Sequence, residues 1–312
     1  MPTESERQSD TRIRLTVFAC LEEQTRIHGD VLPWSLLAHG LYVDGERVPL
    51  VSQQGIFKPR VLPELPLSIR TSAEGPYDDH FGRDGETLLY AYRGTDPKHP
   101  DNVRLRKTMA EQVPLVYFHG VVPGKYLAVW PVYVVGDDPG ALKFSVVADQ
   151  PGLVRELVTG TNVEHVRYTE EVDYRRRYTT TLVRQRLHQR SFRERVFDAY
   201  RGQCAVCRLR HRELLEAAHI IPDTEPGGEP IVSNGLSLCR LHHGAFDTYL
   251  IGVRPDYTVD VRRSVLDETD GPMLRHGLQG VHNQRIWTPR STELKPDRDL
   301  LERRYERFLK AG

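Results

Sequence analysis

Three cysteines and one histidine in the 312-residue chain have the types and spacing of metal ligands. Cys204 and Cys207 form a C-x-x-C pair, and Cys239 and His242 form a C-x-x-H pair further along the chain. Thiolate and imidazole groups are the ligands that a structural Zn²⁺ prefers in a tetrahedral site. The pattern therefore predicts a structural zinc site, which would close a small domain that could not bury enough surface alone.

A second set of polar residues is interleaved with these ligands, and the zinc does not need it. The set consists of His219, Asn234, His243 and Asp247. His243 and Asp247 are four residues apart on a predicted helix, so their side chains share one face. An imidazole beside a carboxylate could hold a second, harder divalent ion at that face.

The segments L-E-A-A-H-I-I-P, N-G-L-S-L-C and H-H-G-A-F-D, in this order, resemble the core of the HNH nucleases. That family has a ββα-metal fold, in which a hairpin carries a general base and a helix presents metal ligands. The resemblance implies that His219 is the base, that Asn234 orients the loop or the base, and that His243 is the final histidine. It also implies that His243 and Asp247 hold Mg²⁺ or Mn²⁺, and that a zinc ion joins the two knuckles.

One position departs from the family pattern. The residue before the base is often an Asp or His that binds the catalytic ion, whereas this chain has Ala218. His243 and Asp247 would then hold the ion together with waters and a DNA phosphate. A plain zinc ribbon without catalysis would use the same four zinc ligands, but it gives no reason for the polar residues between and beside them.

Local patterns predict the elements that position these residues. Ser191 and Glu194 form a capping box, which predicts a helix over 192–200 that stops at Gly202 before the first knuckle. The arginine-rich stretch 156–190 is either a phosphate-contacting connector or a solvated linker helix. In the N-terminal half, many short strands with few helices predict a partly closed β-barrel.

Within that half, Tyr77-Asp78-Asp79, Tyr90-Ala91-Tyr92-Arg93-Gly94 and Asp101-Asn102 resemble the signature of the SRA domain. SRA domains are β-barrel modules that bind DNA with modified cytosine and flip the base into a pocket. The resemblance implies that Tyr77 and Tyr92 stack on the flipped base and that Asp79 accepts a hydrogen bond from its exocyclic amine. An extruded base needs such aromatic faces and a polar partner on its edge. The alternative is an exposed turn followed by ordinary strand tyrosines.

The composition is that of an ordinary soluble protein, but its charge is unevenly distributed. The formal net charge is zero, yet residues 174–312 carry 25 Lys or Arg against 18 Asp or Glu, and residues 1–173 carry 18 against 25. A basic half favours DNA binding, although a solvated face would give the same count. No apolar run approaches the ~18 residues of a membrane span, and the polar start is unlike a signal peptide. With Cys20 as the one cysteine outside the zinc set, we expect a cytoplasmic protein.

Together these observations predict an α+β protein with an SRA-like β-barrel over 1–155, a basic connector over 156–190 and an HNH nuclease domain with a structural zinc over 191–312. The predicted function is cleavage of double-stranded DNA that carries 5-methylcytosine or 5-hydroxymethylcytosine, as in type IV restriction. Two alternatives remain open: an HNH nuclease that ignores modification, and a non-catalytic reader of modified DNA, which Ala218 favours. One such site cuts one strand, so a double-strand break suggests a homodimer.

Overall fold

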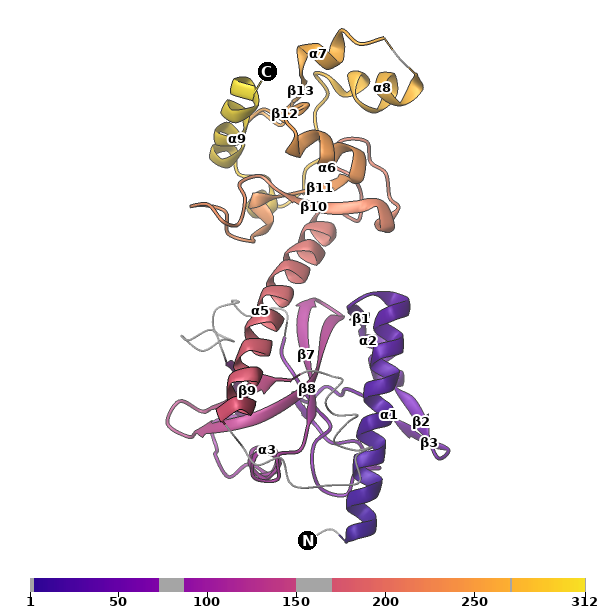
Figure 1. The fold of residues 1–312 in the computed structure, drawn as a ribbon, viewed down its shortest axis with the longest axis vertical. Helices are drawn as coiled ribbons and strands as arrows, with labels where there is room; N and C mark the ends of the chain where they lie inside the picture. Colours follow the sequence, from indigo (N-terminus) through magenta and orange to yellow (C-terminus); the bar gives the residue numbers. More distant parts are fainter. Residues whose placement is uncertain (1–2, 73–86, 150–169, 270, 312) are drawn as a thin grey trace. The chain divides into compact units, whose positions relative to one another are not determined.

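The computed structural model describes residues 3–72, 87–149, 170–269 and 271–311. The chain divides into two compact units, Met1–Leu187 and His188–Gly312, and each is described by itself (Figure 1). Helix α5 (Glu170–Ala199) contributes residues to both units. Within the described ranges, no helix is long and apolar enough to cross a membrane.

The first unit is built on a seven-stranded mixed sheet of order β4-β5-β7-β8-β9-β6, with β1 paired to β8. β5 and β7 run parallel, and the other neighbouring strands run antiparallel. The strands of the sheet are β1 (Val31–Pro33), β4 (Ile56–Phe57), β5 (Ser68–Arg70), β6 (Leu88–Ala91), β7 (Leu115–Val122), β8 (Lys125–Asp138) and β9 (Lys143–Ala148). The unit also has a separate hairpin, β2 (Leu41–Val43) and β3 (Glu46–Val48), and the helices α1 (Glu4–His28), α2 (Trp34–His39) and α3 (Pro100–Ala110).

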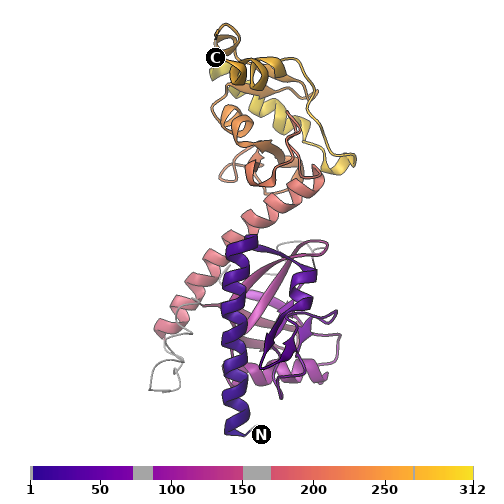
Figure 2. The same ribbon diagram turned by 90° about the vertical axis from the view of Figure 1, so that its right-hand side faces the viewer.

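Both faces of this sheet are covered. In β7, Val116 and Phe118 belong to one core with residues of α1 and α2, whereas Leu115 and Tyr117 belong to a second core with Leu105 of α3. Figures 1 and 2 show α1 lying along one side of the strands. β7 is therefore buried at every position, as expected for a strand with both faces packed.

The sheet is open as far as it is described. β4 and β6 are its edges, and no pairing joins them among the described residues. Irregular register between Leu115 and Tyr117, and between Val134 and Gly136, marks bulges of the kind that bend strands. The predicted α+β class is confirmed, but the observed sheet is only half a barrel, so the SRA-like barrel is not shown.

The second unit is organised around a short hairpin and the helix that follows it. β10 (Leu215–His219) pairs antiparallel with β11 (Gly235–Cys239), which places His219 opposite Gly235. Helix α6 (Arg240–Asp247) begins directly after β11. The remaining elements are β12 (Ile251–Val253), β13 (Val259–Val261), α7 (Arg263–Leu266), α8 (Pro272–Gly277) and α9 (Arg298–Ala311), with short 3-10 turns at Arg212–Leu214, Val232–Asn234, Gln279–Val281 and Thr292–Leu294.

The last turns of α5 pack against this hairpin. Phe192, Val196, Phe197 and Tyr200 are spaced as one helical face, and all four are buried in the core of the second unit. Gly235 makes the close approach possible, because a Cβ atom there would lie 2.5 Å from Val196 Cγ2. The hairpin that carries His219 therefore lies directly on α5.

The start of α5 differs from the prediction. The capping box at Ser191 and Glu194 predicted a helix that begins at 192, but α5 begins at Glu170 and runs through both residues. Ser191 is fully buried, and Glu194 pairs with Arg212. Arginine, glutamine and leucine are good helix formers, and they are frequent between 175 and 190, so the helix continues through a sequence that resembles a cap.

Candidate active site

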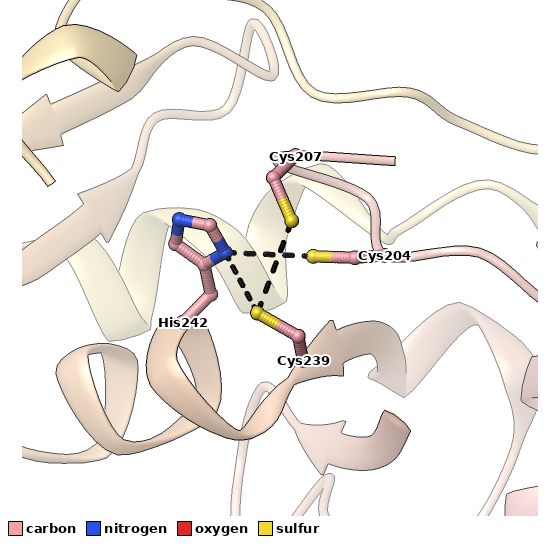
Figure 3. A group of neighbouring side chains, drawn as sticks. All are labelled: Cys204, Cys207, Cys239 and His242. Carbon is pink, nitrogen blue, oxygen red and sulfur yellow. Dashed lines mark hydrogen bonds between the residues drawn. The ribbon is translucent and has the colours of Figure 1, made fainter. Parts of the chain in front are cut away.

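The four predicted zinc ligands converge on one point in the second unit (Figure 3). Cys204 and Cys207 come from the turn after α5, Cys239 ends β11, and His242 lies in the first turn of α6. Their ligand atoms all lie within 4.8 Å of one another. His242 Nδ1 is 3.1 Å from Cys239 Sγ and 3.6 Å from Cys204 Sγ. Three residues of the group are buried, and Cys207 is exposed.

The donor chemistry of this group fits a zinc ion. His242 Nε2 lies 2.8 Å from the carbonyl oxygen of Gly277 in α8, so Nε2–H donates a hydrogen bond to this oxygen. The other nitrogen, Nδ1, is then unprotonated and can bind a metal. Hydrogen bonds from the thiols of Cys204 and Cys207 lower the pKa of Cys239, and hydrogen bonds with Cys204 and Cys239 raise the pKa of Cys207. The metal-free group therefore shares protons among its sulfur atoms, and a bound Zn²⁺ would displace them. Three thiolates and one neutral imidazole form a closed set of the kind found in structural zinc sites.

The next residue of α6, His243, lies in a different environment. Its Nδ1 is 2.5 Å from Glu216 Oε2 of β10, and its Nε2 is 3.2 Å from Asp247 Oδ2 on the same helix. Asp247 is about half exposed, with a side-chain exposure of 55%, and its other oxygen lies 3.5 Å from Arg304. The predicted pair is therefore brought together, and a carboxylate that the sequence did not identify, Glu216, joins it.

His219 lies at the end of β10, stacked on an aromatic ring. Its imidazole and the ring of Phe192 have centroids 4.0 Å apart and planes inclined by 16°. The Nε2 atom is buried and has no hydrogen-bond partner among the described residues. Burial lowers the pKa of His219, and the charge of His243 lowers it further, whereas Asp223 and Asp247 oppose the shift. The imidazole is thus kept in its neutral, proton-accepting form.

Asn234 has a supporting position close to His219. Its side-chain oxygen accepts from the backbone N–H of Ile221 at 2.9 Å, and its amide donates to the carbonyl oxygens of Ile221 at 2.9 Å and Glu229 at 3.2 Å. The side chain is fully buried. Asn234 therefore fixes the chain that leaves β10 immediately after His219.

Residues 204–254 match the HNH endonuclease family. The second unit contains an HNH endonuclease domain. The match begins at Cys204 and ends beyond α6, so it includes the hairpin, the helix, the Cys3His group and the predicted residues His219, Asn234, His243 and Asp247.

Comparison with solved structures finds only weak structural similarity to other proteins. The structure is similar to a modification-dependent TagI restriction endonuclease, with 15% identity, a TM-score of 0.27, and coverage of 78% of this chain and 82% of that one. It is also similar to the type IV phosphorothioation-dependent restriction endonuclease ScoMcrA, with 13% identity, a TM-score of 0.20, and coverage of 58% and 47% respectively. TM-scores this low do not establish a shared overall fold. No curated protein matches the sequence.

Tyr92 of the predicted base pocket lies in the core of the first unit. Its ring packs against Phe144, with centroids 4.6 Å apart, and its side chain is almost fully buried. Its hydroxyl donates to Asp137 and accepts from Arg106 at 3.2 Å. Burial and the hydrogen bond to Asp137 raise the pKa of this phenol. One face of the ring is therefore covered, and the hydroxyl is held in a polar network.

A cavity of about 500 Å³ opens beside Tyr92. Its walls are three chain segments, 53–56, 70–72 and 90–93. Tyr77 and Asp79, the other two predicted pocket residues, lie outside the described residues, in the part of the sequence that connects the second wall to the third. The first unit thus has a cavity, lined by both polar and apolar side chains, to which Tyr92 contributes.

Proposed function

We propose that this protein is a DNA endonuclease that cuts double-stranded DNA carrying modified cytosine. The observation that carries the proposal is the arrangement on β10, β11 and α6, where a neutral histidine, a His–Asp pair and a Cys3His group lie within an HNH endonuclease domain. A non-catalytic zinc ribbon would account for the Cys3His group alone.

In the proposed reaction His219 is the general base. Its Nε2 is buried, so Nδ1 is the nitrogen that accepts a proton from the attacking water. The lowered pKa keeps this nitrogen unprotonated at neutral pH. The stacked ring of Phe192 and the hydrogen bonds of Asn234 hold the imidazole in place during the transfer.

His243 and Asp247 would hold a divalent ion, Mg²⁺ or Mn²⁺, since an imidazole nitrogen and a carboxylate oxygen 3.2 Å apart fit two neighbouring ligands of one ion. When bound, such an ion stabilises negative charge on the phosphate and on the leaving 3′ oxygen. The Cys3His group would hold a structural Zn²⁺, which joins the turn after α5 to the start of α6.

We propose that the first unit reads the modified base. The cavity supports this, because it is large enough for a flipped base and is lined by polar groups such as Gln53, Gln54 and Thr71. Tyr92 lines this cavity and would contact the base there, and Tyr77 and Asp79 would complete the pocket. The preferred targets are 5-methylcytosine and 5-hydroxymethylcytosine.

The proposal extends to the organisation of the chain. The reader would span 1–155, a basic connector 156–190, and the nuclease 191–312. Two copies would cut the two strands of a duplex, acting as a homodimer in the cytoplasm.

Cleavage of matched plasmids tests the proposal. One plasmid carries 5-methylcytosine, a second 5-hydroxymethylcytosine, and a third is unmodified, and each is incubated with Mg²⁺ or Mn²⁺. We expect the modified plasmids alone to be cut. Cutting all three equally would leave a nuclease that ignores modification, and cutting none would leave a reader without catalysis.

The reading step is tested separately in full-length His219→Ala protein, which should bind DNA without cutting it. A fluorescent base analogue at the target position should brighten on binding. Stacking contributes about 1–3 kcal/mol per base, so Tyr92→Ala should weaken binding of modified DNA by roughly tenfold or more. Tyr92→Phe, which keeps the ring, should retain most of the affinity, and Tyr42→Ala, at an exposed position of β2, is a surface control.

A further inference from the structure

Glu216 joins the strand that carries His219 to the helix that carries His243. Its Oε2 lies 2.5 Å from His243 Nδ1, and its Oε1 lies 3.6 Å from the Nε atom of Arg240 in α6. The carboxylate is 42% exposed and lies three residues before His219 on β10. It therefore contacts α6 from the strand, close to where the proposed chemistry takes place.

The two distances at His243 distinguish two kinds of partner. Two ligands of one octahedral Mg²⁺ lie about 3 Å apart, because each metal–ligand bond is about 2.1 Å long. The 3.2 Å between Nε2 and Asp247 Oδ2 is compatible with that separation and also with a hydrogen bond, whereas the 2.5 Å between Nδ1 and Glu216 Oε2 is too short for two ligands of one ion. The shorter contact is a charge-assisted hydrogen bond, which Nδ1–H donates to the carboxylate.

We propose that Glu216 is a positioning residue for the divalent ion of the nuclease. By accepting a hydrogen bond from Nδ1–H, it fixes the tautomer of His243 and turns Nε2 toward Asp247. Carboxylates that hold a metal-binding histidine in this way also make the imidazole a better electron donor. The inference rests on the proposed function, and it assigns a role to a residue that the sequence motif does not include.

The neighbouring residue Ala218 explains why this role matters here. Side chains two apart on a strand share a face, so Glu216 and Ala218 both lie on the side of β10 next to α6. Ala218 is fully buried and offers no ligand atom. Because Ala218 supplies no ligand, β10 would help to position the ion only through the hydrogen bond between Glu216 and His243.

A structural role alone would have a different signature. Partly exposed ion pairs contribute little to stability, so removing Glu216 should leave the fold intact. The effect of Glu216→Ala should therefore appear in metal binding and in the state of His243, and the melting temperature should change little.

The first experiment measures Mn²⁺ affinity of the zinc-loaded, full-length protein by calorimetry. Loss of a carboxylate behind a metal-binding histidine typically costs about 10–100-fold in affinity, and we expect that range for Glu216→Ala. Asp267→Ala is the matched control, because Asp267 is an exposed acid paired with Arg263 on another helix of the same unit. Zinc content and melting temperature should match the wild type in both variants.

The second experiment uses zinc-loaded protein without Mn²⁺ and does not depend on cleavage. Long-range proton–nitrogen NMR spectra report which nitrogen of His243 carries the proton. We expect the Nδ1–H form in the wild type and in Asp267→Ala, and a mixture of both tautomers in Glu216→Ala.

A third experiment measures cleavage as a function of Mn²⁺ concentration. Cleavage by Glu216→Ala should recover at saturating Mn²⁺, because the substitution weakens binding of the ion and leaves His219 unchanged.

Equal Mn²⁺ affinity in the wild type and Glu216→Ala would overturn the inference, and so would a wild type that binds no Mn²⁺ or identical His243 spectra. A wild type that binds Mn²⁺ but cuts no DNA would instead contradict the proposed function. In that case the affinity and the spectra would still decide the role of Glu216.

Discussion

His242 and His243 are neighbours on α6, yet their side chains have opposite surroundings. His242 is almost fully buried; its Nδ1 faces the cysteine sulfur atoms, and its Nε2 is hydrogen-bonded to the backbone carbonyl of Gly277. His243 is partly exposed and has a carboxylate at each nitrogen. Successive helix residues point about 100° apart, so one turn of α6 serves two different sites.

The difference shows what decides the role of a histidine. Three sulfur ligands and one buried imidazole make a closed group that can hold a structural zinc ion, which leaves no position for substrate. Oxygen ligands and partial exposure leave room for water and a phosphate, as a harder catalytic ion requires. The two side chains are the same imidazole, so the difference between their proposed roles comes from the groups that surround them.

The largest expected effect comes from removing a thiolate of the closed group. Cys239→Ser should abolish stoichiometric zinc and unfold the second unit, because binding of a structural metal and folding are linked. Elemental analysis and circular dichroism measure both outcomes. Cys20→Ser, in the first unit, should keep zinc and fold. A folded Cys239→Ser protein without zinc would show that this group is not a structural metal site.

The adjacent histidines allow the same substitution to be compared one residue apart. His242→Ala should lose zinc and unfold the second unit. His243→Ala should retain zinc and melting temperature but lose at least about 100-fold in cleavage, since even residues behind a metal ligand contribute 10–100-fold. Zinc content, thermal melting and cleavage are measured on both variants. If the two variants lose the same property, the division of roles on α6 is wrong.

His219 should affect the rate and nothing else. His219→Ala should slow cleavage by about 10²–10⁴-fold, the usual contribution of a general base, while DNA affinity and zinc content stay close to wild type. Single-turnover cleavage and a gel-shift assay separate the two quantities. Cleavage at the wild-type rate would assign the base to another group.

The smallest effect is expected at the ring beneath His219. Phe192→Leu should admit water to the imidazole and raise the pKa of His219 toward its usual value, because burial is what lowers it. The base works when unprotonated, so the acid limb of the pH–rate profile should move to higher pH, and the neutral-pH rate should fall a few-fold. Phe308→Leu, a buried aromatic against Gly252, is the control for lost packing. An unshifted limb would contradict a role for Phe192.

The sequence predicted the zinc-binding group because its ligands form two short local motifs. C-x-x-C and C-x-x-H place ligand pairs by local chain geometry, and the structure brings all four together. Glu216 could not be found in this way, since its contact with His243 needs β10 packed against α6. The sequence predicted a helix at Phe192, but the stacking of its ring on His219 depends on how the hairpin lies on α5.

In the first unit, strands were easier to predict than their closure. Alternating apolar residues predict strands, but bulges and the identity of neighbouring strands depend on packing between distant segments. The helix start predicted at Ser191 was wrong for a related reason. The serine is buried, and a long run of helix formers before it continues the helix through the local capping signal.

The acceptor for His242 Nε2 is a main-chain oxygen, and this affects how the domain tolerates mutation. Every amino acid carries a carbonyl, so the contact does not depend on which side chain stands at Gly277. A side chain there would first meet Leu241, a partly exposed leucine that can move aside. Sequence drift on α8, where Met273 is 70% exposed, should therefore be nearly neutral. Insertions or deletions that shift the helix should be harmful, because they would move the carbonyl oxygen of Gly277 away from His242.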